Sequence, residues 1–116
     1  MKLITVAESP VVPNPHGLDA HRLFASPDVE VVHIHLPAGK ALVRHAAPVD
    51  TIFYIIAGTA LVESDAGTVQ APAGTLVPHP RETFHRVINE TADRLEFLVI
   101  KTPRPTRPPT FDQPDH

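Results

Sequence analysis

Proline is the residue that most limits how this chain folds. The 116 residues include 14 prolines against 5 glycines, and the prolines are spread from Pro10 to Pro114. A proline inside a helix lacks the backbone N–H, and its ring clashes with the preceding turn, so it kinks or breaks the helix. The sequence therefore excludes long helices, and no stretch beyond about eight residues carries the helical period of about 3.6 residues.

Short segments with alternating apolar residues, separated by turn residues, predict an all-β fold. In the first segment Val32, Ile34 and Leu36 share one face, and the residues between them share the other. Many short strands at close spacing predict a sandwich or a closed barrel. The predicted strands are residues 29–36, 40–46, 51–57, 60–64, 68–71, 75–79, 85–89 and 94–102.

The length fits one domain, within which three zones differ in composition. Residues 1–28 are predicted to form an N-terminal arm and the first strands, and residues 29–102 the barrel. Residues 103–116 form a proline-rich C-terminal tail, which we expect to be extended and either to lie on a surface or to stay mobile.

Charge and composition exclude several classes of function. The formal net charge of -3 gives no electrostatic basis for binding nucleic acid. No apolar run is long enough to cross a bilayer, and the short one at the N-terminus is interrupted by Glu8, unlike a signal peptide. The absence of cysteine removes disulfides and thiol chemistry. We therefore expect a cytoplasmic protein that binds neither nucleic acid nor membranes.

Residues 39–58 resemble the first sequence motif of the cupin superfamily. In that motif a glycine, two histidines, a glutamate and a second glycine follow one another at fixed spacing. Gly39, His45 and Gly58 match in residue type and spacing, whereas Ala47 and Thr51 stand where the family has its second histidine and its glutamate. The first motif is therefore degenerate.

Residues 74–89 resemble the second cupin motif more closely. Gly74, Pro80, His85 and Asn89 match in residue type and spacing, and only Glu82 departs from the pattern, at a position where the family has glycine. The resemblance is to small single-domain members of the conserved-barrel (cupin_2) type. It implies an RmlC-like jelly roll, also called a double-stranded β-helix, with the motif side chains projecting into one open end of the barrel.

The resemblance also implies a metal site, because the family's three histidines and glutamate hold a divalent ion. Carried over residue by residue, His45 and His85 match ligand positions, and Ala47 and Thr51 do not. Strand alternation places His79 on the same face as Val77, so His79 is a third possible nitrogen donor. Our tentative ligands are His45, His85 and His79 for one Fe, Mn, Ni or Zn ion, and a protein without metal is the alternative.

The motif positions and the alternation along the strands together indicate which side chains face the barrel interior. The catalytic residues stay unknown, with His45, His85 and Glu82 as the candidates for acid–base chemistry. Residues on the inward face of the strands should line the cavity, and these are Thr51, Phe53, Ile55, Val77 and His79.

Several other side chains are expected on the outside. His33 and His35 lie opposite the apolar face of their strand, so we expect them at the surface or in a subunit contact. We expect solvation for the histidines of the terminal segments, His16, His21 and His116. An outward row on the most apolar strand is too hydrophobic for a free surface, and many cupins pair as dimers, so we predict a homodimer. That row is Ile52, Tyr54 and Ile56.

Three functional hypotheses remain open on the sequence alone. The first is a protein that binds a small molecule in the barrel cavity and has a degenerate metal site. The second is a metal-dependent dioxygenase or isomerase that uses His45, His85 and His79. The third is a metal-free acid–base enzyme of the sugar-isomerase type. Because one fold hosts many chemistries, the resemblance does not choose among them.

Overall fold

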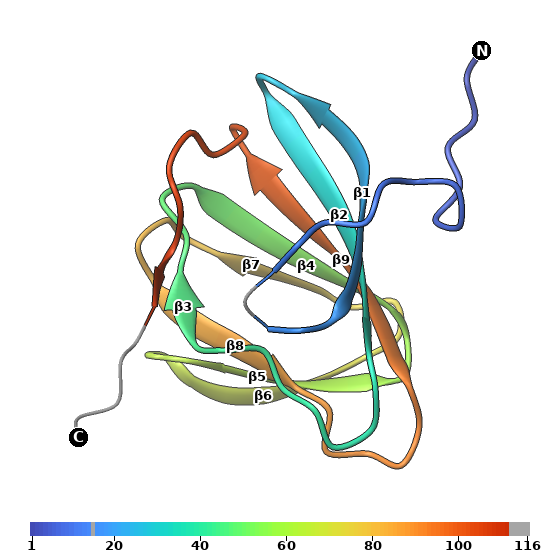
Figure 1. The fold of residues 1–116 in the computed structure, drawn as a ribbon. Coiled ribbons are helices and arrows are strands. Elements are labelled where there is room, and N and C mark those ends of the chain that lie inside the picture. Colours follow the sequence, from blue (N-terminus) through green and yellow to red (C-terminus); the bar gives the residue numbers. More distant parts are fainter. Residues whose placement is uncertain (15, 112–116) are drawn as a thin grey trace.

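The chain folds into two facing β-sheets, as seen in a computed structural model that describes residues 1–14 and 16–111 (Figure 1). Every regular element in this part of the chain is a strand. Sheet A has the order β1-β2-β9-β4-β7 and sheet B the order β10-β3-β8-β5-β6, and all pairings are antiparallel. The predicted all-β jelly-roll barrel is therefore confirmed.

The strand bounds follow the predicted segments closely between residues 50 and 102. Sheet A consists of β1 (Asp19–Ser26), β2 (Val29–Leu36), β9 (Leu95–Thr102), β4 (Asp50–Ala57) and β7 (Leu76–His79). Sheet B consists of β10 (Thr110–Phe111), β3 (His45–Ala46), β8 (Phe84–Ile88), β5 (Thr59–Ser64) and β6 (Gly67–Pro72).

The segment 40–46 differs from its prediction as one continuous strand. It follows β8 only in parts, through an isolated bridge between Ala41 and Ile88 and through the two residues of β3. Leu42 N donates to Val87 O between these two places. The segment therefore runs along β8 without forming a full ladder.

Strands from both terminal zones complete the two sheets. β1 pairs with β2 along nearly its whole length, and β10, which lies in the proline-rich tail, pairs with β3 (Figure 1). The arm before β1 is held by two backbone hydrogen bonds, from Val12 N to Ala20 O at 2.8 Å and from Arg22 N to Pro10 O at 3.0 Å. His116 and the rest of 112–116 lie outside the described residues.

The hydrophobic core fills the space between the sheets. Its largest fully buried apolar side chains come mostly from sheet A, and the rings of Phe53 and Phe97 pack edge to face at 5.7 Å. Burying one such side chain contributes about 1.5–3 kcal/mol to folding. The cluster is Ala20, Ile34, Leu36, Leu42, Phe53, Ile55, Ala60, Val62, Ala71, Val87, Leu95, Phe97 and Val99.

The turn residues of the two motifs have the backbone conformation that their glycines suggest. Gly58 has a φ of 83°, and a Cβ placed there would lie 2.6 Å from the carbonyl oxygen of Arg94. Gly74 has a φ of 86°. Glu82, which replaces a family glycine, also has a positive φ, of 63°. The chain has therefore kept the turn and lost the residue that favours it.

One interpretation of the outer face needs correction. His33 does face away from the core, as predicted, but it is buried, with 6% of its surface exposed. Its Nε2 lies 3.1 Å from Glu96 Oε1, and β2 lies between β1 and β9, so neighbouring strands cover the ring. No helix in the described residues is long and apolar enough to cross a membrane.

Candidate functional site

Strand register brings a row of polar side chains to one end of sheet A. Glu30 pairs with Lys101, Lys101 with Thr51, and Thr51 with His79, across four neighbouring strands. We call these four residues the polar row. The next inward row is apolar, so polar groups are confined to one end. It consists of Val32, Val99, Phe53 and Val77.

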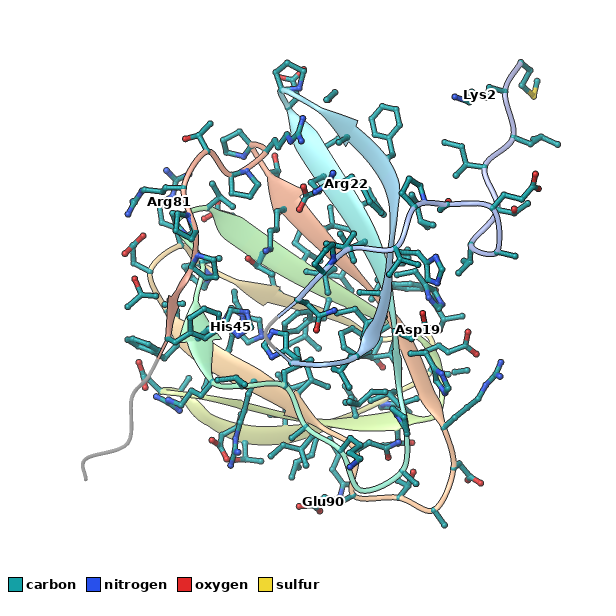
Figure 2. The ribbon with its side chains drawn as sticks, in the orientation of Figure 1. Lys2, Asp19, Arg22, His45, Arg81 and Glu90 are labelled. Carbon is teal, nitrogen blue, oxygen red and sulfur yellow. The ribbon has the colours of Figure 1, made fainter. Side chains whose placement is uncertain are left out.

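Sheet B brings two histidines opposite each other, and they meet the end of the polar row. His45 of β3 pairs with His85 of β8, and their ring centres are 4.8 Å apart. The ring of His79 stacks on that of His85 at 4.5 Å. Phe53 packs edge-on against His79 and His85 at 5.1 and 5.3 Å. We call His45, His79 and His85 the histidine cluster, and Figure 2 shows His45 between the two sheets.

Backbone carbonyls fix the tautomers of two of these histidines. His45 Nδ1 lies 2.7 Å from Val43 O, and His85 Nδ1 lies 3.0 Å from Thr83 O. Because a carbonyl oxygen can only accept, both Nδ1 atoms carry the proton and both Nε2 atoms keep a lone pair. The Nε2 atoms of His79 and His85 are buried without a hydrogen-bond partner.

Burial keeps the cluster uncharged. It lowers the pKa of His85 to about 3, with further contributions from His45 and His79. Burial also lowers the pKa of His45 and of His79. The lone pairs are therefore free at neutral pH, although a group with a pKa of about 3 is a poor proton acceptor there.

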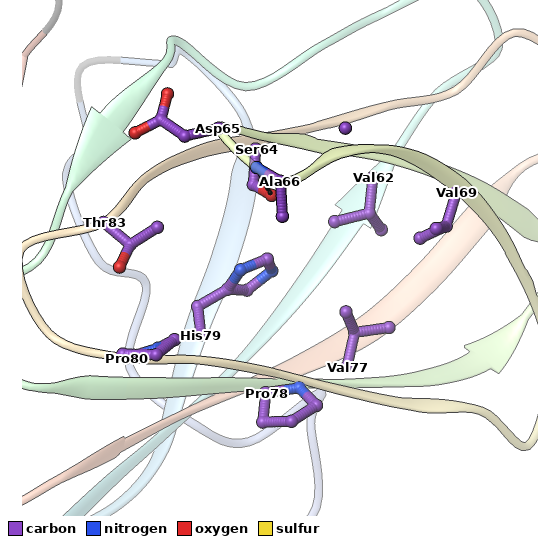
Figure 3. A pocket seen from close by; sticks show the side chains of 11 residues that line it. Val62, Ser64, Asp65, Ala66, Val69, Val77, Pro78, His79, Pro80 and Thr83 are labelled. Carbon is purple, nitrogen blue, oxygen red and sulfur yellow. Dashed lines mark hydrogen bonds between the residues drawn. The ribbon is translucent and has the colours of Figure 1, made fainter.

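Two cavities adjoin the histidine cluster. The larger, with a volume of about 550 Å³, lies between the β5–β6 hairpin and β7, and we call it the groove. Figure 3 shows the His79 ring in the middle of its mainly apolar lining. The lining residues are Val62, Ser64, Asp65, Ala66, Gly67, Val69, Val77, Pro78, His79, Pro80 and Thr83.

The second cavity, of about 190 Å³, reaches the cluster at His45, and we call it the inner cavity. Its walls come from sheet A, from the loop before β1 and from the tail, and they include Lys101, Glu30, His16 and Phe111. The Phe111 ring lies 5.8 Å from that of His45. Thus the barrel end has two mainly apolar cavities, one at His79 and one at His45, and the second is also lined by Lys101 and Glu30.

His16 was expected in solvent, and this is wrong. It is half-buried, its ring centre lies 5.3 Å from that of His45, and its Nδ1 accepts from Val43 N at 2.7 Å. Asn14 holds the loop in place, because its Oδ1 accepts from the backbone N–H groups of His16 and Leu18. Burial and the nearby His45 lower the pKa of His16 to about 4.

The predicted lining residues occupy different depths. Thr51 and Phe53 are buried at 1% exposure, next to the cluster. Ile55 is fully buried in the core and lines neither the groove nor the inner cavity. Val77 is half-buried and lines the groove.

The structure does not bring Glu82 to the cluster. Its left-handed turn leaves the carboxylate in solvent, where it lies 3.3 Å from the guanidinium of Arg107. Its side chain is 54% exposed. The candidate acid–base residues that meet in the interior are therefore His45 and His85 alone.

The side chains at this end of the barrel differ from the metal site that the resemblance implies. Among residues 1–14 and 16–111, no three His, Cys, Asp or Glu side chains are arranged to hold a metal ion. Ala47 and Thr51 are buried at the positions of the missing ligands, and the Thr51 hydroxyl donates to Val49 O at 3.4 Å. The imidazoles alone thus fall short of the three converging ligands typical of catalytic zinc sites.

Comparisons with known proteins bear on the family and the fold. A sequence profile described as Cupin domain matches residues 32–101, and no curated protein matches the chain. An uncharacterized double-stranded beta-helix protein from Klebsiella pneumoniae has a TM-score of 0.80 and 17% identity, over 98% of this chain and 99% of that chain. KdgF from Halomonas sp. has a TM-score of 0.78 and 19% identity, over 89% of this chain and 95% of that chain. The polyketide cyclase RemF from Streptomyces resistomycificus has a TM-score of 0.84 and 15% identity, over 99% of this chain and 87% of that chain. These likenesses show the fold.

Proposed function

We propose, since this chain belongs to the cupin-domain family, that its barrel binds a small organic molecule against the histidine cluster. The observation that carries this proposal is the buried Nε2 atom of His79, which lines the groove and has no hydrogen-bond partner in the described residues. Buried polar atoms in folded proteins nearly always have a partner, so a ring nitrogen that lines a cavity and has none is available to a ligand in that cavity.

The chemistry of the groove suggests what such a molecule offers. The Nε2 atom of the neutral His79 ring accepts or donates a hydrogen bond according to its tautomer, and a hydroxyl group on the ligand satisfies either one. Most of the groove wall is apolar, including Val62, Val77 and Pro78, and this favours a carbon skeleton beside that group. The volume of about 550 Å³ lies in the usual range of small-molecule sites, about 300–1,000 Å³.

The proposal is tested by screening phenols, cyclic diols and sugars by NMR against the wild type and a His79→Phe variant. The variant keeps a ring and removes its nitrogen atoms, and losing one buried hydrogen bond of about 1–1.5 kcal/mol should weaken binding about tenfold. A His35→Phe variant on the outer face of β2 is the control and should bind as the wild type does. Equal affinity in all three proteins, or no binding by any compound, would contradict the proposal.

A second candidate is the metal-dependent enzyme, and one observation favours it. Metal-binding histidines usually donate their other ring N–H to a carbonyl or carboxylate, as His45 and His85 do here. His45, His79 and His85 are the side chains that would take part. Elemental mass spectrometry of the untagged protein and of a His45→Ala/His85→Ala variant tests this. Near-stoichiometric metal that is lost in the variant supports the candidate. No metal in either protein after loading with Fe, Mn, Ni and Zn rules it out.

A further inference from the structure

The inner cavity is lined by a half-buried lysine, Lys101, that the proposed function does not use. Lys101 of β9 follows Leu95, Phe97 and Val99 on the inward face of its strand, and it is the only charged residue among them. Nothing in residues 1–14 and 16–111 forms a hydrogen bond or an ion pair with its amine. Partial burial disfavours the charged form of an amine that has no hydrogen-bond partner, and an anion bound beside it would offset that cost.

Glu30 is the nearest acidic partner across the strands for the Lys101 amine, but the Glu30 carboxylate forms its ion pairs with two arginines instead. Glu30 faces Lys101 across β2 and β9, and its Oε2 lies 3.4 Å from Arg22 Nε and 3.9 Å from Arg104 Nε. Burial lowers the pKa of Lys101, and the charge of Glu30 raises it. Three cations therefore surround one carboxylate at this end of the barrel, which leaves an excess of positive charge in or beside the inner cavity.

Two histidines add one donor and one acceptor to the same cavity. His16 accepts at Nδ1 from Val43 N, so its neutral ring carries the proton on Nε2, which is a donor. His45 donates at Nδ1 to Val43 O, so its Nε2 is an acceptor. One residue, Val43, thus sets the opposite tautomers of two neighbouring rings.

We propose that the inner cavity binds a small hydroxycarboxylic acid: Lys101 and the His16 Nε2–H bind its carboxylate, and His45 Nε2 accepts from its hydroxyl group. The inference rests on the proposed function and names a ligand class for the His45 side of the cluster. The volume of about 190 Å³ is below the usual range of about 300–1,000 Å³ for drug-sized ligands, so the acid is a short one. Phe53, Val99 and Phe111 offer its carbon atoms an apolar wall.

Glycolate is the probe that tests the inference, because it has one carboxylate and one hydroxyl group. It is titrated by NMR into the wild type, Lys101→Met and Lys40→Met, beside acetate, glycolamide and inorganic phosphate at matched ionic strength. Lys40 lies in an exposed loop, and its variant is the matched control. We expect saturable glycolate binding that weakens by at least about tenfold in Lys101→Met and is unchanged in Lys40→Met. Acetate and glycolamide should bind more weakly than glycolate, because each lacks one of its two groups.

Other outcomes separate this inference from the proposed function. Equal glycolate affinity in Lys101→Met and the wild type, or phosphate binding as tight as glycolate binding, overturns the hydroxy-acid site. If glycolate does not bind while a groove ligand still depends on His79, the inner-cavity inference fails and the proposed function stands. If neither binds, both fail. Should Lys101→Met not fold, Lys101→Gln and His45→Phe serve in its place, and unchanged glycolate affinity in both overturns the inference.

Discussion

A single residue, Thr51, changes the charge at this end of the barrel. Where the family has its acid, Thr51 lies in the polar row between Lys101 and His79, so a neutral hydroxyl separates a cation from an imidazole. With a carboxylate at this position, Lys101 would have an anionic neighbour on β4, and an added anion would be disfavoured. The threonine that stands in place of the family's metal-binding acid therefore also leaves Lys101 without an anionic neighbour on β4.

Glu82 gives a prediction at the residue scale. A left-handed backbone conformation costs a non-glycine residue about 1–2 kcal/mol, and Glu82 has a φ of 63°. Glu82→Gly removes this cost. It also loses the exposed ion pair with Arg107, which stabilises the fold by about 0–1 kcal/mol, and it makes the unfolded chain more flexible, which destabilises the fold by about 0.5–1 kcal/mol. These contributions largely cancel, so we expect the free energy of unfolding in urea to stay within about 1 kcal/mol of the wild-type value and to be higher than that of Glu82→Ala. Glu82→Ala keeps the strain and loses the ion pair, so an alanine variant more stable than the glycine variant would refute this account.

At the scale of elements, local pattern predicted the strands, and long-range pairing supplied what the pattern missed. The strands between residues 50 and 102 alternate or end at turn residues, so their sequence is informative by itself. β10 has two residues in a proline-rich tail, and only its pairing with β3 makes it a strand. His16 joins the site through a contact with Val43 that no local period encodes. Lys101 could have been found, because alternation along β9 already places it on the apolar face.

The arm before β1 gives a prediction that depends on pH. His21 Nδ1 lies 2.9 Å from Ser9 O and its Nε2 lies 2.8 Å from Asp19 Oδ1. Both acceptors favour the protonated ring, and the pKa of His21 is raised, most of all by the Ser9 carbonyl. Because the folded pKa exceeds the unfolded value of about 6.5, the stabilisation is complete below that value and is lost as the pH rises through the folded pKa. Across β1 and β2, His21 faces His33, which is itself paired with Glu96.

Thermal unfolding of the wild type and of His21→Asn tests this element. We expect the wild type to exceed the variant in melting temperature at acid pH, and the difference to shrink at alkaline pH. Asp19→Asn is the matched control, and it should reduce the pH dependence without removing the hydrogen bond to Ser9. A difference between wild type and His21→Asn that is constant with pH, or that grows as the pH rises, would show that His21 does not hold the arm by its charge.

At the scale of the whole molecule, the outer face of sheet A carries exposed apolar side chains. Tyr54 and Ile56 of β4 are 38% and 43% exposed, and Leu76, which pairs with Tyr54 from β7, is 55% exposed. Leu98 faces Tyr54 from the other side, on β9. Contiguous exposed apolar residues of this kind mark interaction surfaces. We propose a second copy of the chain as the partner, because two identical apolar faces cover each other in a two-fold dimer.

The mass of the particle in solution decides between a dimer and a monomer with an uncovered face. One chain has a mass of 12.6 kDa, and we expect light scattering after size-exclusion chromatography to give twice that value for the wild type. Tyr54→Lys/Ile56→Lys places two charges in the centre of the face, and the pair of lysines should return the mass to that of one chain, because buried unpaired charges disfavour association. Leu3→Lys, at an exposed apolar residue outside sheet A, should remain dimeric. A wild type of single-chain mass would remove the proposed dimer, and a double variant that stays dimeric would place the contact elsewhere. The histidine cluster lies between the two sheets, away from this outer face, and should keep its ligand in either form.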